Sequence, residues 1–293
     1  MAFNPDAVEN IDQETVENDG PQYPVVQWHY GNLKSKKVGG MDYQGGFFIS
    51  EEMAPADLTE YGWEKTSWVH DSGDETEGFH ARDLELSVIN RRKRWEVQGS
   101  DGRRYNFAWT DYDKAKEQDN PSSRTHFLVI IKGMEELGPF VLTLKGSAGM
   151  HFEGTRTVTG ALTKFSRTAI AAANKLTKKG RWPYRAFWLK VGADRTDDGT
   201  PNFTKVGSGD KSSNVVIPVA LGLPDKPEKV DLNALYVGDE ALALVNELYT
   251  DNTEWAAAWN NIEPGSSDGN ADKYEDEAPE TEITPEAAAA VGL

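Results

Sequence analysis

Residues 91–109 show a period-two alternation of side chains on either side of the turn-forming stretch Gly99–Gly102. Large apolar side chains occupy every second position, and polar or charged side chains lie between them. This pattern predicts a β-hairpin with one apolar and one polar face, so the chain has to build a sheet around it. The apolar face comprises Trp95, Val97, Tyr105, Phe107 and Trp109, and the polar face comprises Arg94, Glu96, Gln98, Arg104 and Asn106.

Cations lead into both strands of this hairpin. They are Arg91, Arg92, Lys93 and Arg94 before the first strand, and Arg103 and Arg104 before the second. Cations beside flat aromatic rings suit a single nucleic-acid strand, because the charges bind phosphates and the rings stack on bases. The alternative interpretation is a half-buried hairpin whose aromatic side chains fill the core while its arginines face water.

The net charge of −17 is unevenly distributed along the chain. Residues 1–24 carry six acidic and no basic side chains, and residues 251–293 carry eleven acidic and one basic. Residues 91–190, by contrast, hold 20 Lys and Arg against nine Asp and Glu. Because the field near a ligand depends on charges within about 10 Å, a basic middle third can bind an anion despite the acidic total.

Several function classes lack support in the sequence. There is no cysteine, and the five histidines show no metal-ligand spacing, so we expect no metal site and no cofactor. No nucleotide-binding or nucleophile motif occurs, so we expect a protein that is not an enzyme. The chain has no apolar run of about 18 residues, which predicts no membrane contact and a cytoplasmic location.

The patterns along the rest of the sequence predict a mainly β body with a few helices, of the α+β class. Two disordered acidic arms flank this body. The arms are residues 1–24 and 263–293, and the body is 25–262. An apolar run predicts a strand at Phe127–Lys132 buried on both faces, and a second strand follows at Phe140–Lys145. A helix is predicted over 159–179, a strand over 181–192, and helical turns from Asp239 and over 253–261. Residues 71–78 and 110–124 are predicted as loops, and 214–221 as a strand.

The strands, the basic aromatic hairpin, the peripheral helix and the acidic tail together resemble the single-stranded DNA-binding proteins of phages and mobile elements. The resemblance covers roughly residues 80–220 and the tail. It implies an embellished OB-like antiparallel barrel in the cytoplasm of a bacterial host, where it protects single-stranded DNA during replication or recombination. It also implies an acidic tail that competes for the groove and docks replication or recombination proteins, and it is compatible with a homo-oligomer.

The resemblance also assigns the candidate binding residues. Stacking would come from Trp95, Tyr105, Trp109 and Trp182. Phosphates would be held by Arg91, Arg92, Lys93, Arg94, Arg103, Arg104, Lys132, Lys145, Lys164, Arg167 and Arg181. Bacterial proteins of this type usually end in a Pro-Phe tip, whereas this sequence ends in Ala-Val-Gly-Leu, which puts recruitment through the tip in doubt.

Two other functions compete with this one. A viral structural or assembly protein, such as a tail or capsid component, needs no basic groove and predicts that the aromatic side chains of 95–109 are buried. An RNA-binding subunit follows the same cationic and aromatic logic, with a preference for ligands that carry 2′-hydroxyl groups.

Overall fold

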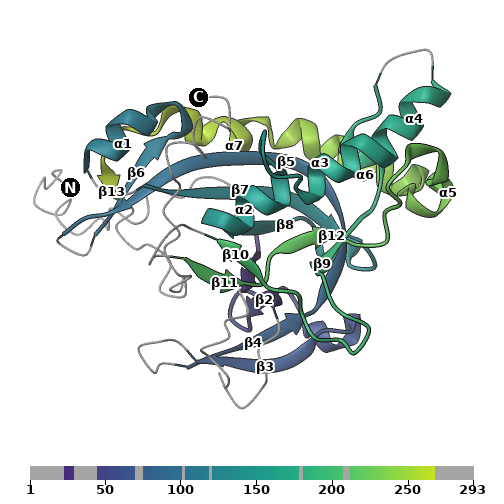
Figure 1. Cartoon of the computed structure of the whole chain (residues 1–293), viewed down its shortest axis with the longest axis horizontal. Helices are drawn as coiled ribbons and strands as arrows, with labels where there is room; N and C mark the ends of the chain where they lie inside the picture. The colour runs from purple at the N-terminus through teal and green to yellow at the C-terminus, as the bar shows by residue number, and fades with distance from the viewer. Residues whose placement is uncertain are drawn as a thin grey trace, which may run out of the picture.

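The computed structural model describes residues 23–29, 45–69, 75–100, 103–118, 121–177, 181–206 and 212–267. Residues 1–22 and 268–293 lie outside this set, and with them nearly all of both predicted acidic arms. Within the described residues, an 11-stranded sheet forms the centre of a mixed α/β fold (Figure 1).

The long strand β5 (Asp83–Gln98) organises the sheet. One of its edges pairs along most of its length with β7 (Ser122–Ile131). Its other edge pairs first with β9 (Leu189–Ala193) and then, at the predicted hairpin, with β6 (Arg104–Ala108). An irregularity between Val88 and Asn90 changes which positions face which side of the sheet. Leu84 and Leu86 face one layer before it, and Trp95 and Val97 face the same side after it.

The other strands extend the sheet on both sides of β5. Beyond β7 come β8 (Phe140–Lys145), β1 (Val25–His29), β2 (Gly46–Ser50), β4 (Glu75–Ala81) and β3 (Glu64–Val69). Beyond β9 comes β12 (Pro218–Ala220), and β13 (Ser266–Ser267) pairs with β6. Strands β10 (Thr204–Val206) and β11 (Ser213–Val215) form a separate pair. The pairing is antiparallel except between β1 and β8. Among the described strands the sheet is open, and the predicted OB-like barrel stays unconfirmed.

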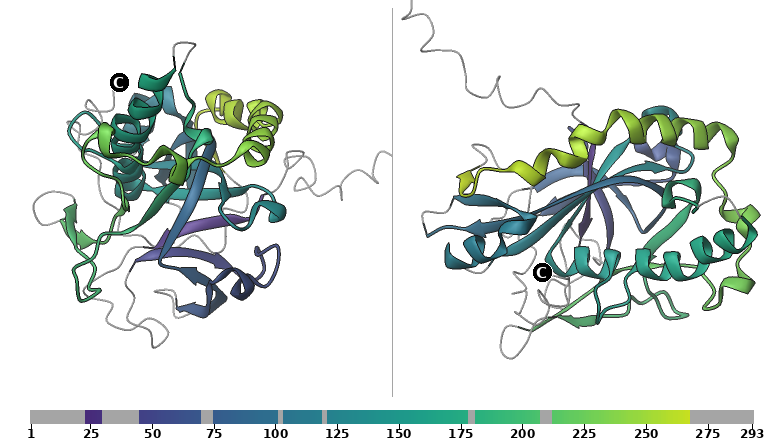
Figure 2. Two further views of the ribbon diagram at one scale, coloured as in Figure 1. Left: turned by 90° about the vertical axis from the view of Figure 1, so that its right-hand side faces the viewer. Right: turned by 90° about the horizontal axis from the view of Figure 1, so that it is seen from above.

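Helices cover both faces of the sheet (Figure 2). On one face lie α2 (Gly146–Glu153) and a continuous helix made of α3 (Ala161–Phe165), the π-helical turn Ser166–Ile170 and α4 (Ala171–Leu176). Phe152 packs there against Phe127 of β7, and Phe165 belongs to the same core cluster. The other face carries α6 (Asp239–Asp251), α7 (Thr253–Ala257) and the 3-10 turn Ala258–Asn261.

The apolar run of β7 is buried on both faces, as the sequence predicted. Its Leu128 and Ile130 pack with Val245 and Trp255 under the C-terminal helices, while its other apolar residues face α2. The short helix α1 (Tyr112–Gln118) covers the hairpin, and α5 (Leu232–Leu235) precedes α6. Shorter 3-10 turns span Leu58–Tyr61, Trp109–Asp111, Glu135–Leu137, Tyr184–Ala186 and Pro227–Lys229.

Four predicted segments differ from the structure. The predicted loop 110–124 contains α1, whose single buried residue, Ala115, leaves no periodicity to detect. The predicted loop 71–78 already belongs to β4 from Glu75, because pairing with β3 holds its acidic residues in a strand. The predicted strand 181–192 begins with a 3-10 turn after Pro183. Finally, 214–221 is divided between β11 and β12, which lie in different sheets.

Two predicted helical segments are confirmed, and the start of the predicted tail is ordered. The predicted helix over 159–179 is helical from Ala161 to Leu176, and α6 begins at Asp239 as predicted. At the boundary of the tail, Gly265 donates its backbone N–H to the Asn106 carbonyl next to the β13–β6 pairing. No helix in the described part of the chain has both the length and the apolarity to span a bilayer.

Candidate nucleic-acid interface

The aromatic side chains of the hairpin form a small core and not a stacking platform. Trp95 is 0% exposed and lies parallel to Trp109, with ring centroids 4.3 Å apart and an interplanar angle of 8°. Its indole N–H donates to the Trp109 carbonyl over 2.8 Å. Tyr105 and Met150 of α2 pack against the same cluster. The predicted stacking role of Trp95 is therefore wrong, because no base can reach its ring.

Two of the cations before the hairpin are paired with one carboxylate. Arg91 and Lys93 each form an ion pair with Glu153, the last residue of α2. The Lys93 ammonium also lies 4.6 Å from the centre of the Trp109 ring. Burial and, to a smaller extent, the charge of Arg91 lower the pKa of Lys93 to about 7, whereas contact with the Glu153 carboxylate acts in the opposite direction. These two cations are partly neutralised from within the protein.

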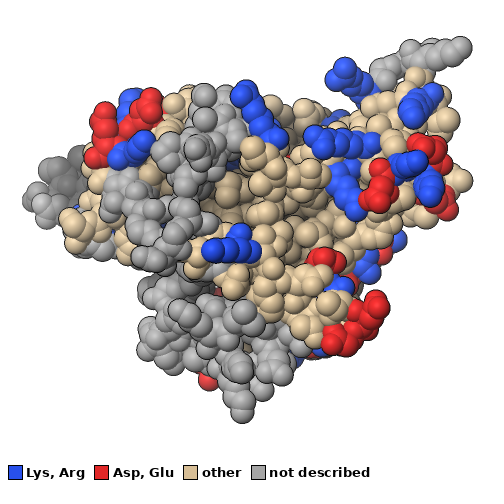
Figure 3. Space-filling view, in the orientation of Figure 1, with Lys and Arg blue, Asp and Glu red and all other residues tan. Residues whose placement is uncertain are grey.

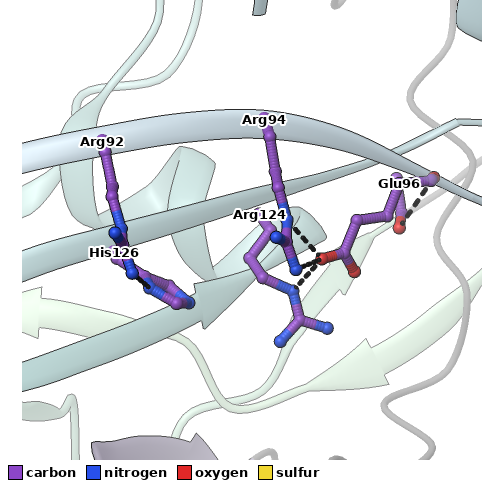
Figure 4. Close-up of polar contacts among 6 residues, drawn as sticks. Arg92, Arg94, Glu96, Arg124 and His126 are labelled. Carbon is purple, nitrogen blue, oxygen red and sulfur yellow. Dashed lines mark hydrogen bonds and ion pairs between the residues drawn. The ribbon is translucent and has the colours of Figure 1, made fainter. Parts of the chain in front are cut away.

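Arg92 and Arg94 point to the same side of β5, toward His126 and Glu96 (Figure 4). Indole rings of the C-terminal helical segments lie against both guanidinium groups. The Arg92 guanidinium lies 4.3 Å and 4.4 Å from the ring centres of Trp255 and Trp259. The Arg94 guanidinium lies 4.4 Å from the Trp259 ring. Arg92 and Arg94 are therefore half-buried against indole rings, and their phosphate-binding roles stay predictions.

A buried ionic cluster continues this row along β5 and β7. Arg94 Nη2 and Arg124 Nε lie 2.7 Å and 2.5 Å from the same Glu96 oxygen. Burial alone would raise the pKa of Glu96, but the charges of Arg124 and Arg94 outweigh it and lower the pKa to about 2. The Glu96 carboxylate thus neutralises part of the charge of Arg94 and Arg124 inside the protein. The sequence did not reveal this pairing, because Arg124 lies in a segment that was predicted as a loop.

His126 extends the row from β7. Its Nδ1 accepts from Arg92 Nη2 over 3.4 Å, because a guanidinium can only donate. Burial, and then the charges of Arg92, Arg124 and Arg94, hold the pKa of His126 well below its ordinary value. The imidazole is therefore neutral at pH 7. Among the described residues, no group of three His, Asp or Glu side chains is placed to hold a metal ion.

The remaining predicted residues are scattered over several surfaces. Lys132 pairs with Glu85 over 2.5 Å, and Lys145 is half-buried where it precedes α2. Arg103 and Arg104 lie at the end of the hairpin beside residues 101–102, which are outside the described set. Trp182 packs its ring 5.5 Å from Phe187 and is half-buried. The structure therefore does not bring these residues into one groove with Arg91–Arg94.

A different surface gathers exposed cations. Residues 154–193 contain nine Lys and Arg and no Asp or Glu, so the helix formed by α3 and α4 lies in a stretch without internal counterions. The backbone N–H of Trp182 donates to Asn174 Oδ1 over 2.8 Å, which places Arg181 beside α4. The turn Pro227–Lys229 packs against the π-helical turn and α4. We call the resulting surface the basic face, and it consists of Lys164, Arg167, Lys175, Arg181, Lys226 and Lys229.

Lys and Arg gather over the upper right of the molecule, with some Asp and Glu among them (Figure 3). The acids within the segment of Lys226 and Lys229 are the exposed Asp225 and Glu228. Lys164 lies 3.8 Å from Asp225, whose side chain is 96% exposed. Within the described residues, Arg167, Lys175 and Arg181 form no salt bridge. Sequence reasoning found Lys164, Arg167 and Arg181 but missed Lys226 and Lys229, which reach this surface through a contact between distant segments. The acid-free stretch 154–193 was the signal that could have singled out the surface.

Comparison with protein-family models, with curated proteins and with solved structures finds no match to this chain. The candidate interface therefore has to be judged from its own chemistry.

Proposed function

We propose that the protein binds single-stranded DNA without catalysis, through the basic face. The observation that carries this proposal is a surface of six cations against two exposed acids, Asp225 and Glu228, on a chain whose net charge is −17. Among the described residues, Lys164 alone of the six forms a salt bridge, at 3.8 Å to Asp225. Exposed cations without counterions attract a polyanion, and each phosphate contact releases condensed counterions. The binding surface is then the helical layer and not the hairpin, because Arg91, Lys93 and Arg94 of the hairpin form ion pairs with carboxylates of the protein itself.

The rest of the function follows from the resemblance noted in the sequence. The acidic tail would compete with DNA for the basic face and dock replication or recombination proteins in the bacterial cytoplasm, in a phage or mobile-element context. An OB-like barrel is not required, because the proposed surface is formed by helices and a neighbouring turn.

The first test removes three cations of the basic face. We expect the variant Arg167→Ala/Lys175→Ala/Arg181→Ala to bind fluorescent oligo-dT roughly tenfold or more weakly than wild type at physiological salt. The slope of log K against log salt should fall by about 2, since each contact on a single strand contributes about 0.7. Fluorescence anisotropy at several salt concentrations measures both quantities.

A matched control changes the same net charge elsewhere. Lys65 on β3 and Lys114 and Lys116 on α1 are exposed cations on other elements. Their triple alanine variant should bind as wild type does. Equal losses in both triple variants would mean that only net charge matters, and wild-type protein that fails to bind at low salt would refute the function. Tighter binding to oligo-U than to oligo-dT would identify RNA as the ligand.

Glu153 limits how many cations face the ligand. Replacing Glu153 by Gln should free Arg91 for phosphate, raise the salt slope by up to about 0.7, and tighten binding to oligo-dT several-fold. Lys93 should add little, because its side chain is 15% exposed and its pKa is lowered to about 7. The matched control is Glu85→Gln, which releases the exposed Lys132 on another part of the sheet. Unchanged or weaker binding by Glu153→Gln, measured in the same titration, would show that Arg91 takes no part.

A viral assembly protein is the second candidate, because burial of the hairpin aromatic side chains is what that function predicts. Light scattering of the full chain distinguishes the two. Rings or tubes in the absence of nucleic acid would favour assembly, and a small particle that binds oligo-dT would favour the DNA-binding function.

A further inference from the structure

Tyr184 is an unusually exposed aromatic side chain for this fold. Among the described residues only Tyr184 and Tyr249 expose an aromatic ring substantially, at 39% and 42%. The aromatic side chains that the sequence suggested for stacking are buried or half-buried. Tyr184 and Tyr249 are therefore the aromatic rings most accessible to a base among the described residues.

The backbone holds Tyr184 in a defined position. It begins the 3-10 turn Tyr184–Ala186 after Pro183, and the Phe187 N–H donates to the Tyr184 carbonyl over 3.1 Å. Ser87 Oγ of β5 donates to the Arg185 carbonyl over 2.9 Å and fastens the turn to the sheet. Ala186 and Phe187 are buried beneath it. A ring presented by a rigid turn loses little entropy when a ligand binds.

Tyr184 lies beside the basic face. Its ring centroid lies 6.1 Å from that of Phe165 on α3, the helix that also carries Lys164. The exposed Arg181 precedes Tyr184 by three residues, and the backbone N–H of Trp182 between them donates to Asn174 Oδ1 of α4. Tyr184 therefore offers an exposed ring at the edge of a cationic surface.

Tyr249 lacks this setting. It belongs to α6, and the Arg185 guanidinium lies 4.0 Å above its ring. Its neighbours on the helix include Glu247 and Asp251, which repel phosphate. The two tyrosines are therefore matched in exposure and different in surroundings.

We propose that Tyr184 stacks on an unpaired base and that Arg181 binds a phosphate beside it, so that the ligand is a strand with accessible bases and not a duplex. This assignment rests on the proposed DNA-binding function. Base–aromatic stacking tolerates any sequence, because every base offers a flat face.

The test compares full-length Tyr184→Ala, Tyr184→Phe and Tyr249→Ala on oligo-dT and on an abasic strand of equal length. Tyr184→Ala should bind oligo-dT about 5- to 150-fold more weakly with an unchanged salt slope, the range found when a base–aromatic stack is removed. Tyr184→Phe and Tyr249→Ala should bind as wild type does. On the abasic strand, which keeps the phosphates, Tyr184→Ala should equal wild type. Arg181→Ala should lower the salt slope by about 0.7 on both strands.

Each outcome decides a separate point. Wild type that binds neither strand refutes the proposed function itself. Wild type that binds oligo-dT while Tyr184→Ala binds equally well, or loses equal affinity on the abasic strand, overturns the stacking assignment alone. Wild type that binds a duplex as tightly as oligo-dT overturns it as well. Thermal melting of each variant checks that the fold is retained.

Discussion

Replacing Glu96 by Gln is expected to lower the free energy of unfolding by about 3–5 kcal/mol, because it leaves two buried guanidinium groups without their carboxylate. Glu96 and Arg124 are 4% and 2% exposed, so water cannot take the place of the missing charge. Urea denaturation of wild type and variant at pH 7 measures the difference. The matched control is Glu85→Gln, whose partner Lys132 is 44% exposed, and it should cost less than about 1 kcal/mol.

The loss of stability caused by Glu96→Gln should depend on pH. The pKa of Glu96 is lowered to about 2 in the folded protein, below its unfolded value. The unfolded state therefore binds the proton more readily, and the stability from Glu96 is fully present above about pH 4.5 and lost as the pH falls toward 2. The neutral, buried His126 adds acid sensitivity below about pH 6.5, but this term is common to both proteins. The difference between wild type and Glu96→Gln should shrink with acidification, and a constant difference would contradict the ion-pair role.

Replacing Trp95 by Ala is the second large effect, with an expected loss of about 3–5 kcal/mol. The residue fills the centre of the hairpin cluster, and its removal deletes the stack on Trp109 and the N–H bond to the Trp109 carbonyl. Denaturation reports the loss of stability, while binding to oligo-dT measured well below the melting temperature should be unchanged. A variant that melts as wild type does and no longer binds DNA would instead place Trp95 at the ligand.

The alternation of 91–109 predicted the hairpin and which side chains share a face, because these depend on neighbours within a few residues. It did not predict what covers each face. Asn90 of β5 donates to the carbonyl of Asn252, 162 residues away, and Arg92 lies under Trp255. From the sequence alone, a cation at an alternating polar position is expected to face water. Arg92 is shielded from water only because residues far along the chain pack over it.

The helical cations were easier to identify. Lys164 and Arg167 lie off the apolar stripe that Phe165 and Ala169 bury, so their exposure follows from the helical period alone. The irregularity between Val88 and Asn90 could not be predicted from the local sequence. No residue type there indicates that even and odd positions of β5 exchange the side of the sheet that they face. Local patterns therefore placed Lys164 and Arg167 off the buried stripe, while Lys226, Lys229 and the surroundings of the hairpin required the whole fold.

The covering of β5 by α7 also bears on how the chain folds during synthesis. Strand β5 is made early, but the side chains that shield Arg92 and Arg94 are Trp255 and Trp259, near the C-terminal end of the described chain. Contacts of such high sequence separation form slowly and late. A nascent chain therefore carries a bare cationic and apolar sheet face until its last helices leave the ribosome, which makes this face the natural target of chaperones and of premature association.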